Sequence, residues 1–227
     1  MLERVNIRNI ISKIVTLVEL QAKKKKLYLI TKIDEAVPEE WNTDPDRLTQ
    51  VLLNLLLNAI KYTVQGGIVL GVSFIPHLKV IQIKVRDTGI GLTEAELTRL
   101  QANLQTLDEN LQKISENSAG IGIGLTISNY LAAILGRGFQ DYIKVKSQSG
   151  KGSEFKFVLE DKQLVHGDVS HYTESIDSIL GDMSPRVRTN GGNRTPFLKK
   201  QSLFAAEHLK RKEKELESFR DYLESSN

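Results

Sequence analysis

Hydrophobic positions in the first 160 residues alternate between helical and strand periods. The opening segment predicts an amphipathic helix, because its apolar residues recur at helical spacing. They are Ile7, Ile10, Ile11, Ile14 and Val18. Residues 27–33 then predict a strand. Asp44 followed by Pro45 is typical of an N-cap and a first helical residue, and predicts a long helix over about residues 46–61.

Two further segments alternate apolar and polar residues with period two. Residues 67–74 and 79–86 therefore predict strands, and the intervening Ile-Pro-His-Leu turn at 75–78 favours an antiparallel pair. Thr93 and Glu96 have the spacing of a capping box and predict a short helix from about Glu94.

One more helix and two more strands are predicted before residue 160. A helix is predicted from about Gly124 to Leu135, where Gly136 ends it. Strands at 142–148 and 153–159 are joined through a glycine-containing turn at 149–152. Strands outnumber simple βαβ repeats, so the pattern predicts an α/β (α+β) sandwich. Its sheet is mixed and mostly antiparallel, with helices packed on one face.

Beyond Glu160 the apolar periodicity stops. Residues 161–202 have the composition of a polar, flexible linker, rich in Gly, Pro, Ser and Asn. Residues 203–227 interleave Glu with Lys and Arg and predict a charged helical tail. The expected organisation is therefore a domain over 1–160, a linker over 161–202 and a tail over 203–227.

Composition excludes several classes of function. The 227 residues contain no cysteine, which excludes disulfides, thiolate catalysis and cysteine–metal sites. A net charge of +3 does not favour nucleic acid or membrane binding, and the run Lys23–Lys26 is interpreted as a solvated helix end. The N-terminus is too polar to open a signal peptide, and no apolar run reaches the roughly 18–20 residues of a membrane helix. We expect a cytoplasmic chain, whether or not its parent protein is membrane-anchored.

The long helix carries the first chemically interesting residues. Asn54, Asn58 and Lys61 share one stripe at helical spacing, with Tyr62 beside it. Asparagine is a poor helix former, so two among leucines ask for an explanation. An amide oxygen can ligate Mg²⁺, and a lysine one turn along can reach a phosphate. The alternative is that both amides simply face water, and the helix alone does not decide between the two.

Two glycine-rich segments follow. Asp87 ends a strand and is followed by Gly89 and Gly91, so its carboxylate could accept a hydrogen bond from an exocyclic amine while the glycines let backbone approach a flat ring. A plain turn is the alternative. Gly120, Gly122 and Gly124 open a helix, where free N–H groups and the helix dipole favour phosphate. The spacing is GxGxG outside a βαβ unit, which argues against a dinucleotide-binding Rossmann site.

The order of these segments carries a resemblance. DPDRLTQVLLNLLLNAIKYT resembles the N box, VRDTGIGL and GIGIGLTIS the two glycine boxes, and GKGSEFKFVL the closing segment of sensor histidine kinases. From about Val5 to Leu159 the chain is similar to their catalytic ATP-binding domain. That domain belongs to the ATPase superfamily of gyrase, Hsp90, histidine kinases and MutL, and has a Bergerat-type ATP-binding fold.

The resemblance implies a role for each matching residue. Asn58 would be the Mg²⁺ ligand, with Asn54 nearby, and Lys61 would contact phosphate. Tyr62 would flank the adenine and Asp87 would accept from its amine. The remaining cofactor-binding residues implied are Gly89, Gly91, Gly120, Gly122, Gly124, Leu125 and Ser153. The implied cofactors are ATP and Mg²⁺, and the implied catalytic residues are Asn58 and Lys61.

Two departures from the family pattern refine the expected activity. Hydrolytic relatives carry a glutamate at the place of Asn54, and an amide cannot act as a general base, so free-standing ATP hydrolysis should be slow. The segment between Gly91 and Gly120 contains no phenylalanine, whereas the family's lid usually does. A degenerate ATP-sensing or structural module without phosphotransfer therefore remains the alternative function.

No histidine in the chain has the context of a phosphate acceptor. His77 lies in a predicted turn, and His166, His171 and His208 lie in the polar tail. The resemblance implies a two-component protein-histidine kinase that donates the γ-phosphoryl group of ATP to a histidine outside this sequence. The implied partners are an acceptor-histidine and dimerisation domain, in cis or in trans, and a downstream receiver domain. No nucleic acid and no membrane segment of this chain are expected.

Overall fold

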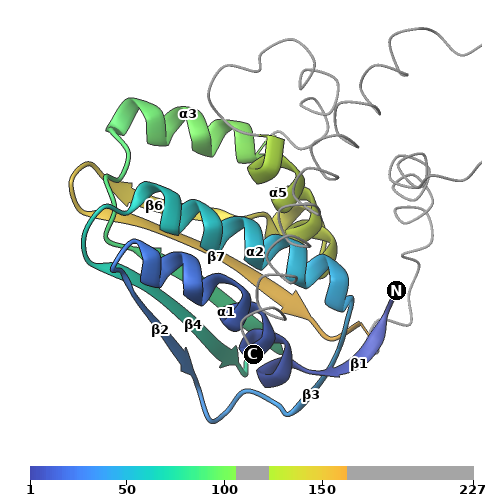
Figure 1. Ribbon diagram of the computed structural model, residues 1–227. Coiled ribbons are helices and arrows are strands. Elements are labelled where there is room, and N and C mark those ends of the chain that lie inside the picture. The colour runs from blue at the N-terminus through green and yellow to red at the C-terminus, as the bar shows by residue number, and fades with distance from the viewer. Residues whose placement is uncertain (106–122, 163–227) are drawn as a thin grey trace, which may run out of the picture. The chain divides into compact units, whose positions relative to one another are not determined.

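A computed structural model describes residues 1–105 and 123–162 of the chain (Figure 1). The elements, in chain order, are β1 (Glu3–Asn6), α1 (Ile7–Lys24), β2 (Tyr28–Ile33), β3 (Glu40–Thr43), α2 (Pro45–Tyr62), β4 (Gly67–Ile75), β5 (Val80–Asp87), α3 (Glu94–Gln105), α5 (Ile123–Leu135), the 3₁₀ turn η1 (Phe139–Asp141), β6 (Lys144–Gln148) and β7 (Gly152–Glu160). The expected linker at 161–202 and tail at 203–227 fall almost entirely outside the described residues.

The central feature is a five-stranded sheet of order β2-β4-β5-β7-β6. Only the β2–β4 pair is parallel, and the other three pairs are antiparallel. This confirms the predicted mixed, mostly antiparallel sheet and its two hairpins, β4–β5 and β6–β7. Helices α1, α2 and α5 pack on one face of the sheet, as Figure 1 shows.

A second, two-stranded sheet was not anticipated. Strand β1 pairs with β3 in antiparallel register, with Glu3 opposite Thr43. Each strand has four residues, too few to display an alternating pattern that would predict it. The antiparallel register places the start of β1 beside the end of β3, next to the start of α2.

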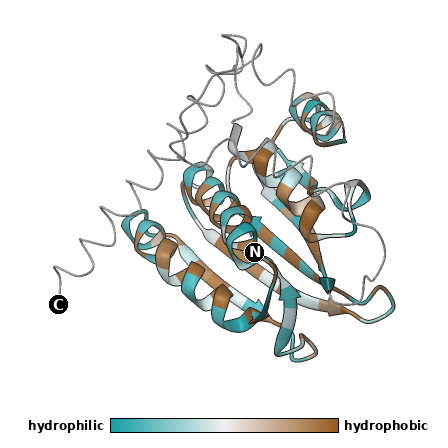
Figure 2. Ribbon diagram, turned by 90° about the vertical axis from the view of Figure 1, so that its right-hand side faces the viewer, coloured by the Kyte–Doolittle hydropathy of each residue, from teal (hydrophilic) through white to brown (hydrophobic). Residues whose placement is uncertain are grey.

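Strand alternation explains which side of the sheet faces the helices. Along β5, Ile81, Ile83 and Val85 are buried, whereas the intervening Lys84 and Arg86 are more accessible. Strand β6 and the first part of β7 alternate in the same way between lysine or glutamate and apolar residues, and Figure 2 colours such positions teal and brown. Because successive strand side chains point to opposite faces, the helix-covered face is apolar, whereas the other face is polar on β5 and β6 and carries the exposed Tyr28 and Ile30 on the edge strand β2.

Helix α2 begins and ends on specific contacts. The Asp44 Oδ1 accepts a hydrogen bond from the Arg47 backbone N–H (3.0 Å), and Pro45 is the first helical residue, as predicted. One apolar face of this helix is buried: Leu48, Val51, Leu52, Leu55 and Ala59.

The C-terminus of α2 revises the interpretation of the basic run. The Lys25 Nζ donates to the carbonyls of Ile60 (2.8 Å), Lys61 (2.9 Å) and Thr63 (3.2 Å). Lys25 therefore neutralises free carbonyls at the negative end of α2, and the lysine run at 23–26 is more than a solvated helix end.

Helix α3 begins with the predicted capping box. The Thr93 Oγ1 accepts from the Glu96 backbone N–H (3.3 Å), and the Glu96 carboxylate accepts from the Thr93 backbone N–H (2.8 Å). These bonds lower the pKa of Glu96 below its ordinary value. Helix α3 packs along the edge strand β6.

Candidate functional site

Asp87, the last residue of β5, is the buried acid of the site. Its side chain is only 5% exposed, and its Oδ1 accepts from the backbone N–H groups of Gly89 (2.8 Å) and Ser153 (3.2 Å). Burial raises the pKa of Asp87, and the two backbone hydrogen bonds oppose that shift. Its Oδ2 makes no hydrogen bond within the part of the chain that the structure describes. The carboxylate is thus fixed through one oxygen and available through the other.

Glycines allow the backbone to close around this carboxylate. A Cβ on Gly89 would lie 2.5 Å from the Tyr62 carbonyl oxygen, so the turn after β5 passes directly against the end of α2. The Ile90 N–H donates to the same carbonyl (3.2 Å). Gly152 has φ +96° and no room for a side chain beside the Asp87 backbone. The plain-turn interpretation does not account for this convergence of three segments on one acid.

Gly91 joins the same region to the β6–β7 turn. It adopts φ +64°, and a Cβ there would overlap the Gln148 carbonyl. The Gly150 N–H donates to the Ile90 carbonyl (2.8 Å). Ser153 contributes its backbone N–H to Asp87, while its hydroxyl bonds that of Ser147 (2.9 Å). The GKGS segment is therefore both a hairpin turn and a contributor to the Asp87 environment.

The asparagine stripe of α2 divides into an inner and an outer part. Asn54 is 7% exposed, and its Nδ2 donates to the Ser128 Oγ of α5 (2.9 Å). The alternative that both amides simply face water is therefore wrong for Asn54. Asn58 is half-buried and Lys61 is exposed. The Lys61 Nζ lies 5.0 Å from the centroid of the Tyr62 ring.

The start of α5 lies against this stripe. A Cβ on Gly124 would be 2.6 Å from the Asn54 Oδ1, so the absence of a side chain permits the two helices to approach. The next residue, Leu125, packs against the apolar cluster of Leu100, Leu104 and Val145. Any contribution of Leu125 to phosphate binding would come from its backbone. Gly120 and Gly122 lie outside the described residues.

Four polar side chains support the site without having been singled out by the sequence. Thr88 accepts from the Gly67 N–H (3.0 Å), and Ser147 accepts from the Leu92 N–H (2.9 Å). On α5, Ser128 holds Asn54, while Asn129 bridges the Leu104 carbonyl (2.9 Å) and the Ile143 N–H (2.7 Å). A single hydroxyl or amide side chain leaves no periodic pattern in a sequence. The one local signal is that Ser128 and Asn129 interrupt an otherwise apolar helix, in which both prove to be buried.

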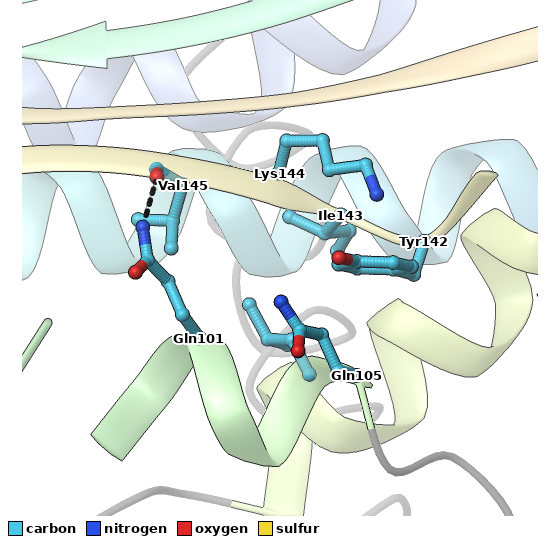
Figure 3. Close-up of a pocket in the computed structure, with 7 residues that line it drawn as sticks. Gln101, Gln105, Tyr142, Ile143, Lys144 and Val145 are labelled. Atoms are coloured by element: carbon cyan, nitrogen blue, oxygen red, sulfur yellow. Dashed lines mark hydrogen bonds between the residues drawn. The ribbon is translucent and has the colours of Figure 1, made fainter. Parts of the chain in front are cut away.

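A separate hollow of about 190 Å³ lies between α3 and β6 (Figure 3). The Gln101 Nε2 crosses it to donate to the Val145 carbonyl (3.2 Å). Its lining residues are Gln101, Leu104, Gln105, Tyr142, Ile143, Lys144 and Val145. None of the predicted site residues lines this hollow, which separates it from the Asp87 site.

Comparison with known proteins agrees with this geometry. Residues 43–163 match the family described as "Histidine kinase-, DNA gyrase B-, and HSP90-like ATPase". The chain belongs to this family. The match extends from the end of β3 past the end of β7, and so includes α2, Asp87 and the start of α5.

Curated relatives of this ATPase-family chain are named as sensor kinases. It is 39% identical over 136 residues to the sensor histidine kinase RcsC of Escherichia coli, which covers 58% of the chain and 13% of RcsC. It is 36% identical over 118 residues to a homologue of the aerobic respiration control sensor protein ArcB from Haemophilus influenzae, covering 52% of the chain and 34% of the relative. The chain thus spans about a third or less of these relatives' own length. The described residues form a histidine-kinase-type ATP-binding domain.

Solved structures agree with the fold. Full-length ShkA in complex with AMPPNP is 26% identical, with a TM-score of 0.56 over 70% of this chain and 30% of ShkA. The catalytic domain of histidine kinase ThkA, at 20% identity, has a TM-score of 0.55 over 71% of this chain and 98% of that domain.

Among the helices of residues 1–105 and 123–162, none has the length and hydrophobicity of a membrane span.

Proposed function

We propose that this chain binds Mg-ATP and is the catalytic part of a two-component protein-histidine kinase. It would donate the γ-phosphoryl group to a histidine on a separate domain or chain. The observation that carries the proposal is the buried Asp87 carboxylate, held through Oδ1 by two backbone N–H groups and bordered by glycines that admit no side chain. Family membership and the relatives named as sensor histidine kinases support it.

The proposed roles divide the nucleotide between the two ends of the site. At the base end, Asp87 accepts a hydrogen bond from the adenine amine, Tyr62 flanks the ring, and Gly89 and Gly91 shape the pocket. Ser153 acts there through Asp87, because its N–H holds the carboxylate.

At the phosphate end, Asn58 and Lys61 act as the catalytic residues. Asn58 holds the metal through its amide oxygen, and Lys61 pairs with phosphate. Gly120, Gly122, Gly124 and the Leu125 backbone complete this end, where a helix start favours anions. Bound Mg²⁺ neutralises phosphate charge, and it normally combines few protein ligands with phosphate oxygens and water. A half-buried neutral amide on α2 is a suitable ligand of that kind.

Asn54 determines which reaction this arrangement favours. Its amide is engaged with Ser128 and cannot take a proton from water. ATP bound at this site would therefore be hydrolysed slowly. Transfer would require a nucleophile from outside the described site, and the four histidines of the chain lie outside the proposed machinery. We propose an acceptor-histidine domain and a receiver domain as the partners.

A titration with ATP tests nucleotide binding. Mg-dependent binding should fall at least tenfold in Asp87→Ala, and its metal dependence should be lost in Asn58→Ala. Gln50→Ala, also on α2 but two turns away from Asn58, is the matched control and should bind as the wild type does. Binding that is independent of Mg²⁺ and unchanged in both site variants would refute the nucleotide assignment.

A transfer assay separates the kinase from the alternative of an ATP-sensing module. The chain is mixed with a histidine-acceptor domain and labelled ATP, and the product is tested for acid-labile, base-stable phosphate. Label on the acceptor, absent with Asn58→Ala, supports the kinase. ATP binding without any transfer to acceptor domains of related sensor kinases would favour the sensing module, whose motivating feature is the lid without phenylalanine.

A further inference from the structure

The face of the sheet opposite the helices carries a row of lysines. Lys84 on β5 lies opposite Lys156 on β7, and Lys156 lies opposite Lys144 on β6. In the other direction, Gly71 on β4 lies opposite Lys84 and pairs with Lys32 on β2. One line across all five strands thus reads Lys32, Gly71, Lys84, Lys156, Lys144. It is called the lysine row below.

Strand alternation places the side chains of Lys84 and Lys156 on the face that none of the described helices α1, α2 and α5 covers. The neighbours of Lys84, Ile83 and Val85, are buried against the helix layer. The side chain of Lys84 must therefore point the other way. The same holds for Lys156, which lies between Phe155 and the buried Phe157.

The row is unneutralised within the described residues. None of its four lysines forms an ion pair there, and Lys144 instead stacks on the Tyr142 ring, 3.1 Å from its centroid. The next line of residues adds Arg86 and Lys146, with Glu154 between them. Like charges directly opposite each other destabilise a sheet. The fold therefore gains nothing from placing three adjacent lysines side by side.

Gly71 is a second, independent irregularity in the same row. It lies in the interior of β4 without a positive φ, and a Cβ there would meet only the Lys84 Cβ at 3.9 Å, an ordinary contact. No neighbour in the structure requires glycine at this position, and glycine weakens a strand interior. Such a glycine often marks a place where another backbone approaches closely.

We propose that the lysine row is a docking surface for an acidic α-helix of a partner protein. A helix places side chains on one face about every 5.4 Å, close to the spacing of about 4.8 Å between strands. Carboxylates one turn apart can therefore meet successive lysines along a row of about 19 Å, which is about 13 helical residues. Gly71 supplies the notch in which the helix backbone approaches the sheet.

The observations favour a protein over a single-stranded nucleic acid or a lipid surface. Base recognition on a sheet uses stacking aromatics, and in the described residues the aromatic rings near the row are Tyr28, at the edge strand β2, and Tyr142, which is occupied by Lys144. The centre of the face offers no exposed apolar side chain to insert into a bilayer. A rigid row at strand spacing suits a partner whose charges have a fixed repeat.

The test uses the full chain and a labelled helical peptide with Glu at every turn on one face. Fluorescence anisotropy at low salt should show saturable binding that weakens as salt is added. A peptide of the same composition, with its Glu residues distributed around the helix, should bind at least fivefold more weakly. No binding of the one-faced peptide, or equal binding of both peptides, would overturn the proposal.

Variants identify the surface. Lys84→Glu with Lys156→Glu should raise the Kd at least tenfold, and Gly71→Val should raise it severalfold by filling the notch. The matched control, Lys13→Glu with Lys23→Glu on the exposed side of α1, changes the net charge equally and should bind within twofold of wild type. The Lys84→Glu with Lys156→Glu change exchanges one like-charge pair for another and should leave the melting temperature near that of the wild type, whereas Gly71→Val removes a strand glycine and should leave it unchanged or higher. Equal loss in the control pair would show mere net-charge attraction and overturn the assignment.

The other possible occupants give distinct results. Single-stranded DNA of random sequence and phosphatidylserine–phosphatidylcholine vesicles are titrated in the same way. Tighter binding of either, lost in the Lys84–Lys156 variant, would replace the acidic helix by that occupant and overturn the proposal. ATP binding is measured alongside and should not change in these variants, so failure of this surface and failure of the nucleotide site remain distinguishable.

Discussion

At the scale of single residues, Asp87 combines two opposing requirements. Its burial destabilises the charged form and raises its pKa, while the Gly89 and Ser153 N–H groups favour that form. A folded-state pKa above the unfolded value means that the ionised carboxylate opposes folding above that range. A neutral hydrogen-bond acceptor at this position could accept the same two bonds, so the fold itself does not require an ionisable side chain here.

The substitution Asp87→Asn separates these requirements. An amide oxygen can still accept from Gly89 and Ser153, so the free energy of unfolding at pH 7 should equal or exceed that of the wild type. The gain should shrink toward about pH 3, where Asp87 is protonated in both states. ATP binding should nevertheless fall at least tenfold. Urea denaturation at the two pH values and an ATP titration check this, and a variant that is destabilised at pH 7 would contradict the burial argument.

Gly124 is a residue whose small size matters for the contact between α2 and α5. Alanine normally stabilises a helix relative to glycine by about 1 kcal/mol, but here its Cβ would meet the Asn54 Oδ1 at 2.6 Å. A shift of the Asn54 amide away from this Cβ would disturb its hydrogen bond to Ser128.

We therefore expect Gly124→Ala to lower the free energy of unfolding by about 1–3 kcal/mol, as overpacking does. It should also weaken ATP binding, because the start of α5 is displaced. Gly71→Ala, where a Cβ has room, is the control and should be neutral or stabilising. Denaturation curves of the two variants decide, and a stabilised Gly124→Ala would show that the helices separate without cost.

At the scale of elements, helix ends connect the site to the rest of the sheet. Helix α3 begins at the Thr93–Glu96 capping box, immediately after Leu92 is held by Ser147. It ends near Leu104, whose carbonyl is held by Asn129 of α5. The first residues of α3 are thus tied to the β6–β7 hairpin and its last turn to α5.

Removal of the Thr93 cap tests how much the stability of the domain depends on helix α3. Thr93→Ala should reduce the free energy of unfolding by about 1 kcal/mol, while Thr93→Ser should retain most of it because the hydroxyl remains. Hydrogen exchange should quicken in α3 before it quickens in the sheet. A loss spread evenly over the domain would argue that α3 has no stability of its own.

At the scale of the whole molecule, the proposed nucleotide site draws on three elements that are far apart in the sequence. Asp87 follows β5, Asn58 lies on α2, and Gly124 opens α5. A ligand that contacts all three stabilises only the folded chain.

Mg-ATP at about 100 times its Kd should therefore add about 2.7 kcal/mol to the free energy of unfolding. For a domain of this size, that corresponds to a rise in melting temperature of about 5–11 °C. ATP without Mg²⁺ should give a smaller rise, and Asn58→Ala should remove the difference. Differential scanning fluorimetry measures it. Steady-state hydrolysis in the same samples should stay slow without an acceptor domain, and rapid turnover would contradict the role assigned to Asn54.

Much of the fold could be predicted from the sequence because most of its helices and strands have local sequence patterns. The caps at Asp44 and Thr93, the period-two strands and the glycine turns each depend on residues a few positions apart, and all appear at their predicted places within a few residues. The pairing of β1 with β3 and the parallel pairing of β2 with β4 were not predicted, because the pairing of distant strands leaves no local sequence pattern.

The sequence by itself determined the order of the elements and of the nucleotide-binding segments, since spacing along the chain is enough to show both. Only the tertiary structure decided how those segments meet. Asn54 is hydrogen-bonded to Ser128, 74 residues away in the sequence, and Ser153 to Asp87, 66 residues away. Lys25 is hydrogen-bonded to the last carbonyls of α2. The lysine row likewise exists only in the strand register, because its five members belong to five different strands. Contacts of this kind follow from the packing of helices and the pairing of strands, which no local pattern of residues encodes.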